Sequence, residues 1–310
     1  MAVSSPRVSV VVPCFNAEPY LRQALESVRA QTRSPLECLV VDDGSTDRSA
    51  EIAASFGPPV RLLRQHNQGR AAAANRAIAE ARGDLVMFLD ADDFWHPEMV
   101  AAQVDAVVRT GAALAYCPAV RCDAAGVESG SQIARPLPER CIRELLPANL
   151  IVVCGACLRT EVARDLGGFD GRFWPADDYH LWLRVAARHR IAYQPRPLGR
   201  YRVHGRQVSQ QLARMAVAAL DARRDFLRRH PDVRRQLGSD FIRSAVEDPF
   251  FELVRENVDA RRQQAARHLA RAYLRRWPHR RRGWACALRS HLPWRLFALS
   301  VTGPDTARTT

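Results

Sequence analysis

The sequence contains no lysine, so all 46 of its basic residues are arginine. Set against 33 acidic residues, they give the 310-residue chain a formal net charge of +13. Arginine codons are rich in G and C and alanine is also abundant, so genomic base composition accounts for part of this excess. The remainder predicts an attraction to phosphate groups, whether those of nucleotides, nucleic acid or lipid head groups.

Long apolar runs are also missing. No segment approaches the roughly 20 apolar residues that a helix needs to cross a bilayer. The apolar run within residues 1–15 is too short for a signal peptide, and no cleavage site of small residues follows it. These absences predict a cytoplasmic protein, a location that also allows peripheral contact with the inner face of the membrane.

The eight cysteines lack the paired spacing of a zinc site. Cys154 and Cys157 form a single C-x-x-C pair without a second pair to complete it. The others are scattered through apolar or ordinary surroundings. We therefore expect small buried thiols and no metal framework made of cysteine.

Strand-like and helix-like segments alternate through the first third of the chain. Short β-branched runs occupy residues 8–13, 36–43, 60–65 and 84–90, and helical patterns between them occupy residues 20–30, 47–56 and 70–81. Strands buried on both faces and joined by helices predict an α/β fold with a doubly wound, mainly parallel sheet. Such sheets bind ligands at the carboxyl ends of their strands. We expect the polar residues after the first, second and fourth strands to share one crevice.

Three carboxylates, Asp90, Asp92 and Asp93, follow the fourth of these strands in the segment "DLVMFLDADDFWHP". Like charges this close repel one another and resist leaving water unless a positive charge compensates them. Mg(II) and Mn(II) prefer oxygen ligands and are commonly held by one or two carboxylates together with substrate phosphates. A solvated turn is the alternative. Neither a G-x-x-x-x-G-K-[ST] loop nor a G-x-G-x-x-G turn is present, so a metal-bridged diphosphate fits better than ordinary ATP or NAD binding.

The second strand ends in "DDGSTD". Here Ser45 or Thr46 is expected to cap a helix, and Asp47 suits the positive end of the helix dipole. That explanation leaves Asp42 and Asp43 at the strand end. Their carboxylates are placed to accept hydrogen bonds from a base or a ribose.

The last third of the chain changes character. In "QAARHLARAYLRRW" the apolar residues recur at helical spacing, which predicts a packed helical appendage. Arginines mixed with Trp277, Trp284 and Trp294 suit an interface rich in anionic lipids, and a solvated helical cap fits equally well. No recognised nucleic-acid module accompanies the charge. Residues 302–310 are expected to form a loose tail.

Five segments carry a family resemblance as an ordered series. They read "VSVVVPCFNAEPYLRQALESVRAQT", "LVVDDGSTDRS", "NQGRAAAANRAIAEARGDLVMFLDADD", "LGGFD" and "DDYHLWLR". Over roughly residues 7–210 the chain resembles the family 2 glycosyltransferases with the GT-A fold. The resemblance implies a glycosyltransferase domain in residues 1–210, with a nucleotide-sugar half (1–120) and an acceptor half (121–210), followed by a helical region in residues 211–310.

The activity that this resemblance implies is an inverting sugar transfer. The donor is a nucleotide-diphosphate sugar, with a UDP-sugar favoured, and the cofactor is Mn(II) or Mg(II). The acceptor is a hydroxyl of a saccharide or a lipid-linked molecule in cell-surface polysaccharide or glycoconjugate synthesis.

The resemblance also assigns residues to the nucleotide and the metal. Asp43 matches the acid that binds the nucleobase. Asp90 matches a residue that helps to hold ribose and metal, and Asp92 a direct metal ligand. An amphipathic helix surface explains Arg76 as well as a nucleotide contact does. The residues matched to the edge of the base and ribose are Pro13, Phe15 and Glu18. Asp93 matches a third acid beside the metal acids. Asn75 and Arg76 match a polar stretch of the third helix that lies under the nucleotide.

An in-line displacement also needs a base that takes the acceptor proton. By resemblance this base is Asp178, and Asp177 stands where the family more often has glutamate. A helix N-terminal acid pair is a compatible explanation. Arg202 and His204, in a Y-R-x-H segment, are implied to meet the diphosphate or the metal. Residues 181–183 fit the buried face of a helix better than a sugar platform, and residues 166–170 fit a glycine-ended helix beside the acceptor.

Two rival functions remain open. A nucleotidyltransferase would use the same metal carboxylates on a nucleoside triphosphate, would release pyrophosphate and would have no role for Asp178. A non-catalytic scaffold that binds sugar nucleotides or lies on a membrane surface would bind nucleotide without turnover.

Overall fold

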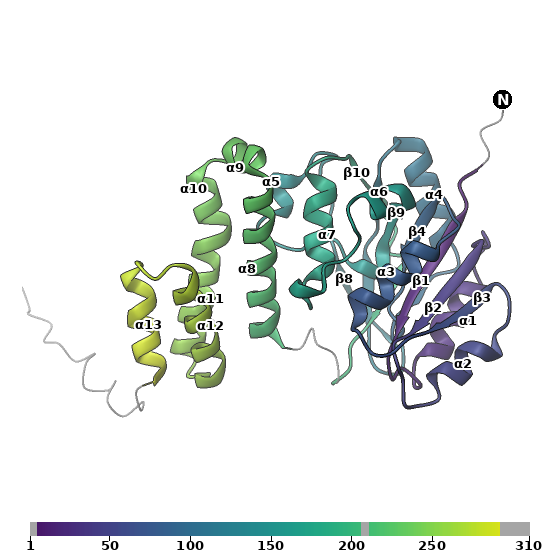
Figure 1. Ribbon diagram of the computed structural model, residues 1–310, viewed down its shortest axis with the longest axis horizontal. Helices are drawn as coiled ribbons and strands as arrows, with labels where there is room; N and C mark the ends of the chain where they lie inside the picture. Colours follow the sequence, from purple (N-terminus) through teal and green to yellow (C-terminus); the bar gives the residue numbers. More distant parts are fainter. Residues whose placement is uncertain (1–4, 206–210, 292–310) are drawn as a thin grey trace, which may run out of the picture.

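The computed structural model describes residues 5–205 and 211–291. An α/β portion is followed by an all-helical portion, and the two lie side by side (Figure 1). The expectations for Trp294 and for a tail in residues 302–310 lie outside the described residues.

A seven-stranded sheet forms the centre of the α/β portion. Its strand order is β10-β6-β9-β4-β1-β2-β3. β9 runs antiparallel to both of its neighbours, and the other pairings are parallel. The four strands expected from the sequence are β1 to β4, and β4 lies in the middle of the sheet. The bounds are β1 Val8–Cys14, β2 Glu37–Asp42, β3 Val60–Arg64, β4 Leu85–Phe88, β6 Leu114–Tyr116, β9 Ala156–Arg159 and β10 Ile191–Tyr193.

Helices cover both faces of this sheet. α1 and α4 pack in one hydrophobic core, whereas α3, α6 and α7 pack in the other. In α1 the residues Leu21, Ala24, Leu25 and Val28 are buried, as their spacing predicts. The bounds are α1 Leu21–Arg29, α2 Ser49–Ser55, α3 Arg70–Glu80, α4 Met99–Thr110, α5 Ile142–Leu145, α6 Thr160–Asp165 and α7 Asp177–Ala186, with short 3-10 turns η1 at Val153–Gly155 and η2 at Gly171–Phe173.

The expected cap of the second helix is wrong. α2 begins at Ser49, and Asp47 Oδ1 accepts the hydrogen bond of the Ser49 backbone N–H. Ser45 serves another segment, because its Oγ accepts a hydrogen bond from the Asn16 backbone N–H at 3.0 Å. The Ser45 hydroxyl therefore links the loop after β2 to the loop after β1, and α2 begins only at Ser49.

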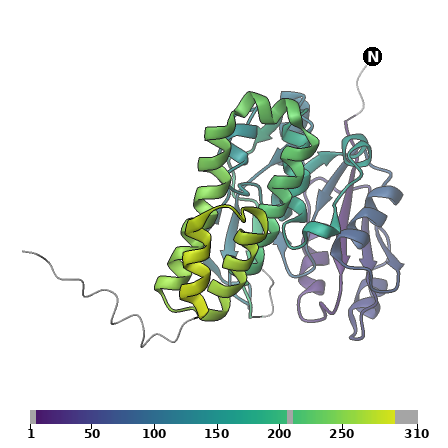
Figure 2. The same ribbon diagram turned by 60° about the vertical axis from the view of Figure 1, so that its left-hand side comes forward.

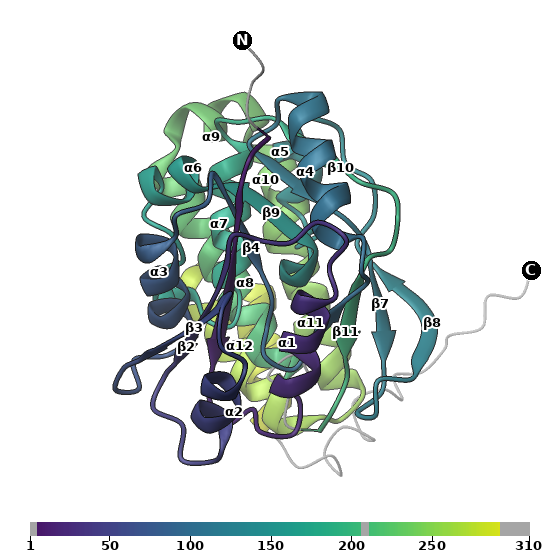
Figure 3. The ribbon, with the colours of Figure 1, turned by 90° about the vertical axis from the view of Figure 1, so that its right-hand side faces the viewer.

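A smaller four-stranded sheet has the order β5-β11-β7-β8 (Figure 3). β11 lies between β5 and β7, and its last residues lead to His204. This sheet therefore carries residues 202–204 to the segment that follows β4. The bounds are β5 Phe94–Trp95, β7 Ala119–Cys122, β8 Glu128–Ile133 and β11 Gly199–Arg202.

Every described element after residue 211 is helical, as the sequence predicts (Figure 2). α8 packs against α7 of the α/β portion, and α12 packs against α8, α11 and α13. Among the described residues, no helix is long and apolar enough to span a membrane. The bounds are α8 Leu212–Arg229, α9 Pro231–Leu237, α10 Ser239–Ile242, the π-helical turn η4 Arg243–Glu247, α11 Asp248–Asp259, α12 Gln263–Arg276 and α13 Arg281–His291.

All eight cysteines are free and buried, which confirms the expectation of buried thiols. Residues 181–183 are also fully buried, as expected for the inner face of α7.

Candidate active site

The polar ends of β1, β2 and β4 meet because these strands are neighbours in the sheet. Asp43, just after β2, accepts a hydrogen bond from the Gly69 backbone N–H at 2.8 Å. Arg70 follows Gly69 and binds Asp90, which lies beyond the end of β4. The polar groups at the carboxyl ends of these strands are thus connected by direct contacts.

Asp43 is only 3% exposed and organises the loop before α3. Its Oδ1 accepts hydrogen bonds from Gln65 Nε2 and the Gln68 backbone N–H, at 2.8 and 2.9 Å. Together with the bond from Gly69, these use three of the roughly four acceptor positions of a carboxylate. One position on Oδ2 is left for a donor such as the N–H of a base.

The loop after β1 is fixed to the loop after β2. Asn16 adopts a positive φ of 49°, and its Oδ1 accepts a hydrogen bond from the Thr46 backbone N–H at 2.8 Å. Glu18 accepts hydrogen bonds from Arg48, whose charge and N–H groups lower the pKa of Glu18. Pro13 is partly buried and Phe15 is half exposed. Phe15 therefore offers an open aromatic surface at this edge.

Arg70, the first residue of α3, joins the two acidic motifs. Its Nε donates to Asp90 Oδ1 at 3.0 Å, and its Nη1 donates to Asp177 Oδ2 at 3.2 Å. The guanidinium also lies 5.3 Å from the centre of the Phe169 ring. Although burial opposes the charged form, the carboxylates of Asp90, Asp177 and Asp178 raise the pKa of Arg70 above its ordinary value. One cation thus compensates acids that are far apart in the sequence.

Asp92 faces His204. Its Oδ2 lies 2.9 Å from His204 Nε2, and the imidazole stacks on Tyr20 with ring centres 4.8 Å apart. Asp92 is partly exposed, so its carboxylate can reach a ligand in the crevice. The structure brings Asp92 and His204 into direct contact, and their role as metal ligands stays a prediction.

Asp90 and Asp93 differ in their surroundings. Burial raises the pKa of Asp90, and the nearby Asp92 adds to the rise, whereas Arg70 opposes it. Asp93 is 1% exposed, and burial together with Asp92 and Asp90 raises its pKa well above the ordinary value. Its Oδ1 accepts the hydrogen bond of the Arg202 backbone N–H at 2.9 Å. Asp93 therefore holds the small sheet in place beneath the other two acids.

The Arg202 side chain is almost completely buried. Its N–H groups donate to the carbonyl oxygens of Asp92 and Ala124, at 2.7 and 2.8 Å, and to Gln23 Oε1. The guanidinium also lies 4.9 Å from the centre of the Tyr20 ring. These contacts support a role in positioning the Asp92 backbone, and a direct contact between Arg202 and a diphosphate stays a prediction.

Asp178 lies in the first turn of α7 beside Asp177, which is 2% exposed. Burial raises the pKa of Asp178 to about 7 and the Asp177 carboxylate adds to the rise, whereas Arg70 acts against it. Asp178 accepts hydrogen bonds from the Tyr179 backbone N–H and from Asn149 Nδ2, at 2.6 and 3.1 Å. A carboxyl group with this pKa can exchange a proton near neutral pH.

Asn75 and Arg76 on α3 point to different surroundings. The Asn75 side chain donates to the Phe169 carbonyl oxygen and accepts from the Phe169 N–H, both at 2.8 Å. Arg76 Nη1 donates to the Arg64 carbonyl oxygen at 2.7 Å. Asn75 therefore fixes the loop of residues 166–170 under Arg70, and a nucleotide contact by either residue stays a prediction.

The loop of residues 166–170 has the predicted glycine turn. Gly167 and Gly168 have φ values of 73° and 65°. A Cβ on Gly168 would stand 2.1 Å from Asn75 Oδ1, so any larger residue would displace the clamp on Phe169. The glycines are therefore required by the turn itself.

The donor set suits a cation that a substrate helps to hold. Within residues 5–205 and 211–291, no group of three or more His, Cys, Asp or Glu side chains is arranged to hold a metal ion by itself. Asp92 and His204 would supply two neighbouring ligands, and Asp90 lies two residues before Asp92 with its Oδ1 bound by Arg70. Mg(II) and Mn(II) commonly use one or two carboxylates and complete their coordination with phosphate and water. The residues present fit such an ion when a diphosphate shares it.

Sequence reasoning missed two residues of this site, Arg70 and Asn149. Arg70 stands in the quoted segment "NQGRAAAANR", where an arginine directly after a glycine at a helix start is the only signal. Its acidic partners are 20 and 107 residues away, so no local pattern reveals the bridge. Asn149 lies in the loop before η1 and carries no signal of its own.

Known glycosyltransferases resemble this chain in sequence. An uncharacterized glycosyltransferase of Rickettsia typhi is 27% identical over 219 residues, which make up 66% of each protein. The uncharacterized glycosyltransferase YibD of Escherichia coli is 39% identical over 125 residues, which make up 39% of this chain and 36% of YibD. The aligned part thus spans about two thirds of the first relative and about a third of the second.

Solved glycosyltransferases share the fold. TarS of S. aureus, solved in complex with UDP, superposes with a TM-score of 0.53 at 19% identity and covers 92% of this chain and 89% of its own. The mannosyltransferase PcManGT of Pyrobaculum calidifontis, solved with GDP-Man and Mn2+, gives a TM-score of 0.59 at 21% identity over 95% of this chain and 83% of its own. At such identities the likeness establishes the fold alone, which is the GT-A fold that the resemblance implied.

The model of the family described as "Glycosyl transferase family 2" matches residues 9–167, just over half of the 310-residue chain. The matched range contains β1 to β4 with the acids at their ends, and it stops before α7. By this match the chain belongs to glycosyl transferase family 2.

Proposed function

We propose that this chain transfers a sugar from a nucleotide-diphosphate donor to a hydroxyl of a saccharide or lipid-linked acceptor, with inversion at the anomeric carbon. One observation carries the proposal. Arg70 binds both Asp90, which follows β4, and Asp177 of α7, and so links the segment of Asp92 and His204 to Asp178, whose pKa is about 7. Cell-surface polysaccharide or glycoconjugate synthesis is the process that this chemistry suits.

In the proposed reaction the acceptor oxygen attacks the anomeric carbon while the bond from that carbon to the diphosphate oxygen breaks. The proton of the acceptor hydroxyl passes to the Asp178 carboxylate, and the nucleoside diphosphate leaves. Asp92 and His204, with Asp90 beside them, would hold Mn(II) or Mg(II). The ion would neutralise negative charge on the departing diphosphate. Arg70 keeps Asp90 and Asp177 in place from the side of α3.

The nucleotide end of the site is formed by the loops after β1 and β2. The remaining acceptor position of Asp43 suits an imide N–H such as that of uracil, and Phe15 provides an apolar surface next to it. TarS was solved with UDP-GlcNAc and PcManGT with GDP-Man. A UDP-sugar is the donor that we favour, because uracil presents the single N–H that Asp43 can still accept.

The domain division and the location belong to the same proposal. We assign residues 1–120 to the donor half, residues 121–210 to the acceptor half and residues 211–310 to a helical region. A cytoplasmic location with peripheral contact at the inner face of the membrane fits an acceptor that is lipid-linked.

Calorimetric titration with UDP, GDP, dTDP and CDP, each with and without Mn(II), tests the proposal. Metal-dependent binding of one of these nucleotides supports it and identifies the donor base. The purified protein is then incubated with the matching sugar nucleotide, and the nucleoside diphosphate released by transfer to an acceptor or to water is measured.

The rival functions give different results in the same assays. A nucleotidyltransferase would release pyrophosphate from a nucleoside triphosphate and would keep this activity in Asp178→Asn. A scaffold would bind the nucleotide and release no product. Either outcome would overturn the proposal.

A further inference from the structure

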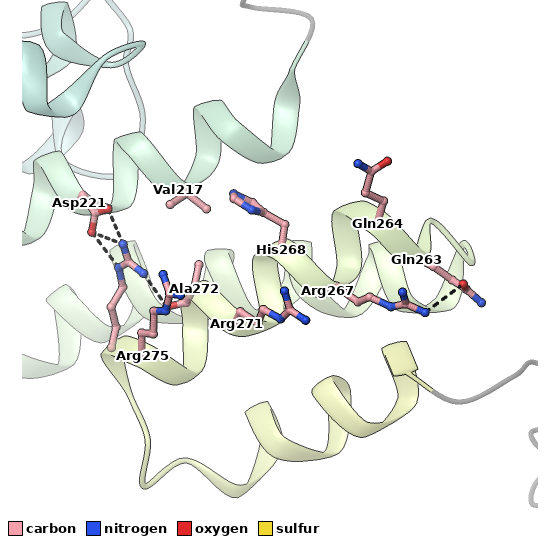
Figure 4. A pocket seen from close by; sticks show the side chains of 10 residues that line it. Val217, Asp221, Gln263, Gln264, Arg267, His268, Arg271, Ala272 and Arg275 are labelled. Carbon is pink, nitrogen blue, oxygen red and sulfur yellow. Dashed lines mark hydrogen bonds and ion pairs between the residues drawn. The ribbon is translucent and has the colours of Figure 1, made fainter.

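A groove outside the candidate active site lies between α8 and α12 (Figure 4). Its volume is about 730 Å3. Val217 and Asp221 line it from α8, and Arg267, Arg271 and Arg275 line it from α12. His268 of α12 is directed toward α8. The α12 wall of the groove is therefore strongly basic, and Asp221 is the charged group that α8 adds to the lining.

The three arginines recur every four residues, so they lie along one face of α12. Arg271 and Arg275 are exposed, and neither makes a hydrogen bond or ion pair with another described residue. Arg267 donates to the carbonyl oxygen of Ser290 at 3.0 Å and to Gln263, which are uncharged acceptors. Among the described lining residues Asp221 is the only carboxylate, and it is already bound by Arg276. The positive charge of this face is therefore uncompensated within the described part of the chain.

Elsewhere in the helical region arginines meet carboxylates. Arg282 binds Glu247 and Asp248, and Arg228 binds Asp225. The region also has acids available, because residues 211–291 contain nine of them beside 19 arginines. The row of Arg267, Arg271 and Arg275 on α12 differs from these ion pairs because no carboxylate of the described residues binds it. Like charges at four-residue spacing destabilise a helix. A ligand that brings negative charge would remove that cost.

The groove lies toward the end of the helical region at which α8 begins. α8 starts at Leu212, seven residues after Gly205, and its lining residues Val217 and Asp221 lie in its first half and just past its middle. Figure 1 shows the start of α8 at the edge toward which β1 and β2 run, opposite α9. The start of α8 therefore lies on the side of the molecule to which the carboxyl ends of β1 and β2 point.

We propose that this groove binds the phosphate groups of anionic lipid head groups and so holds the protein on a membrane surface. Arginine suits this ligand because its guanidinium donates paired hydrogen bonds to phosphate oxygens. Several arginines near an anionic leaflet add to one another in binding strength. Lipid binding is independent of catalysis in this proposal, and only the presentation of a lipid-linked acceptor beside the crevice depends on the proposed function.

Vesicle sedimentation with the full chain tests the proposal. The probes are vesicles of phosphatidylcholine alone and vesicles of phosphatidylcholine mixed with phosphatidylglycerol. The protein should sediment with the mixed vesicles and remain in the supernatant with the neutral ones, and added salt should weaken the binding. The groove variant is Arg271→Gln/Arg275→Gln. Its matched control is Arg234→Gln/Arg235→Gln, which removes the same charge from exposed positions on α9 at the opposite end of the molecule.

The groove variant should bind the mixed vesicles about tenfold more weakly or worse, whereas the control should change binding by less than about twofold. All four positions are exposed, so circular dichroism should show both variants folded like the parent. Equal losses in the two variants, or no binding of the parent to mixed vesicles, would overturn the proposal. So would a groove variant that loses binding to single-stranded RNA or to soluble polyphosphate while it keeps binding to vesicles. Because no sugar nucleotide is used, these outcomes are separate from success or failure of the proposed transfer reaction.

Discussion

The α/β portion and the helical region differ in how far acidic residues balance their arginines. Residues 1–210 contain 25 arginines and 23 acids, whereas residues 211–291 contain 19 arginines and nine acids. In the first region Arg70 and Arg202 are largely withdrawn from solvent and bind groups that border the crevice. In the second, Arg271 and Arg275 stand exposed without an acid. Arg70 and Arg202 thus hold groups of the candidate site in place, whereas the exposed row on α12 carries the positive charge that we propose to bind anionic lipid.

Among the changes that test this comparison, the largest effect on activity is expected at Asp178, the acid of the α/β portion whose pKa burial raises and Arg70 acts to lower. Asp178→Asn keeps the shape of the side chain but removes the proton acceptor, so kcat should fall by about 10²–10⁴-fold. Nucleotide affinity should stay within about twofold because the change lies on α7, away from the β1 and β2 loops. Single-turnover transfer and calorimetry measure the two effects separately. Full turnover by this variant would show that another group is the base.

The pH dependence of the parent enzyme follows from the same residue. The base works as a carboxylate, and burial raises the pKa of Asp178 to about 7. As the pH falls below about 7 the carboxyl group becomes protonated, so kcat should drop about tenfold per pH unit and reach a plateau above that pH. A kcat profile at saturating donor measures this. An acidic plateau without a break near neutral pH would contradict the assignment.

Asp92→Asn should act on binding more than on proton transfer. The amide loses the charge that Asp92 offers to a cation beside His204. Metal-dependent nucleotide affinity should fall by about tenfold or more, a charge-assisted contact being lost. Titration with and without Mn(II) is the measurement. If the metal-free affinity fell equally, Asp92 would be a nucleotide contact and not a metal ligand.

Arg70→Gln should reduce activity because the acids after β4 and those at the start of α7 lose the cation that binds both groups. Asp90 and Asp177 lose their shared partner, and the positive charge that lowers the pKa of Asp178 disappears. Turnover at neutral pH should fall about tenfold, and the rising part of the pH profile should move to higher pH. Arg70→Lys should keep the profile near its original position while it recovers part of the turnover.

The control for this change is Arg109→Gln on α4, an exposed residue that pairs only with Asp105 among the described residues. It removes one positive charge far from the crevice, so the pH profile should not move. A loss of activity in Arg70→Gln with an unchanged profile would mean that Arg70 supports the fold and does not tune the base.

The periodicity of the sequence predicts the part of this site that lies at the ends of β1 to β4. It does not predict the residues that distant segments bring to the site. The runs that became β1 to β4 alternate with amphipathic helices, so the neighbouring carboxyl ends and their acids were predictable. The antiparallel strand β9 and the small sheet that carries Arg202 depend on contacts between distant segments. The bridge by Arg70 is of the same kind. The start of α2 was missed because a hydroxyl that usually caps a helix binds the Asn16 backbone N–H instead.

The smallest predicted effect concerns the exposed arginines of α12 and the free energy of unfolding. Arg271 stands between Arg267 and Arg275 at four-residue spacing, and such like-charge pairs cost about 0.2–0.5 kcal/mol each. Glutamine has nearly the same helix propensity as arginine. Arg271→Gln should therefore leave the free energy of unfolding unchanged or raise it by up to about 1 kcal/mol in urea denaturation at low salt. Arg276→Gln should lower it, because Arg276 binds Asp221 and the Ala272 carbonyl oxygen. If both variants were equally destabilised, Arg271 would be a structural residue of α12. If Arg271→Gln raises the free energy of unfolding while Arg276→Gln lowers it, the row of arginines weakens its own helix, as expected for charges that a negatively charged ligand would neutralise.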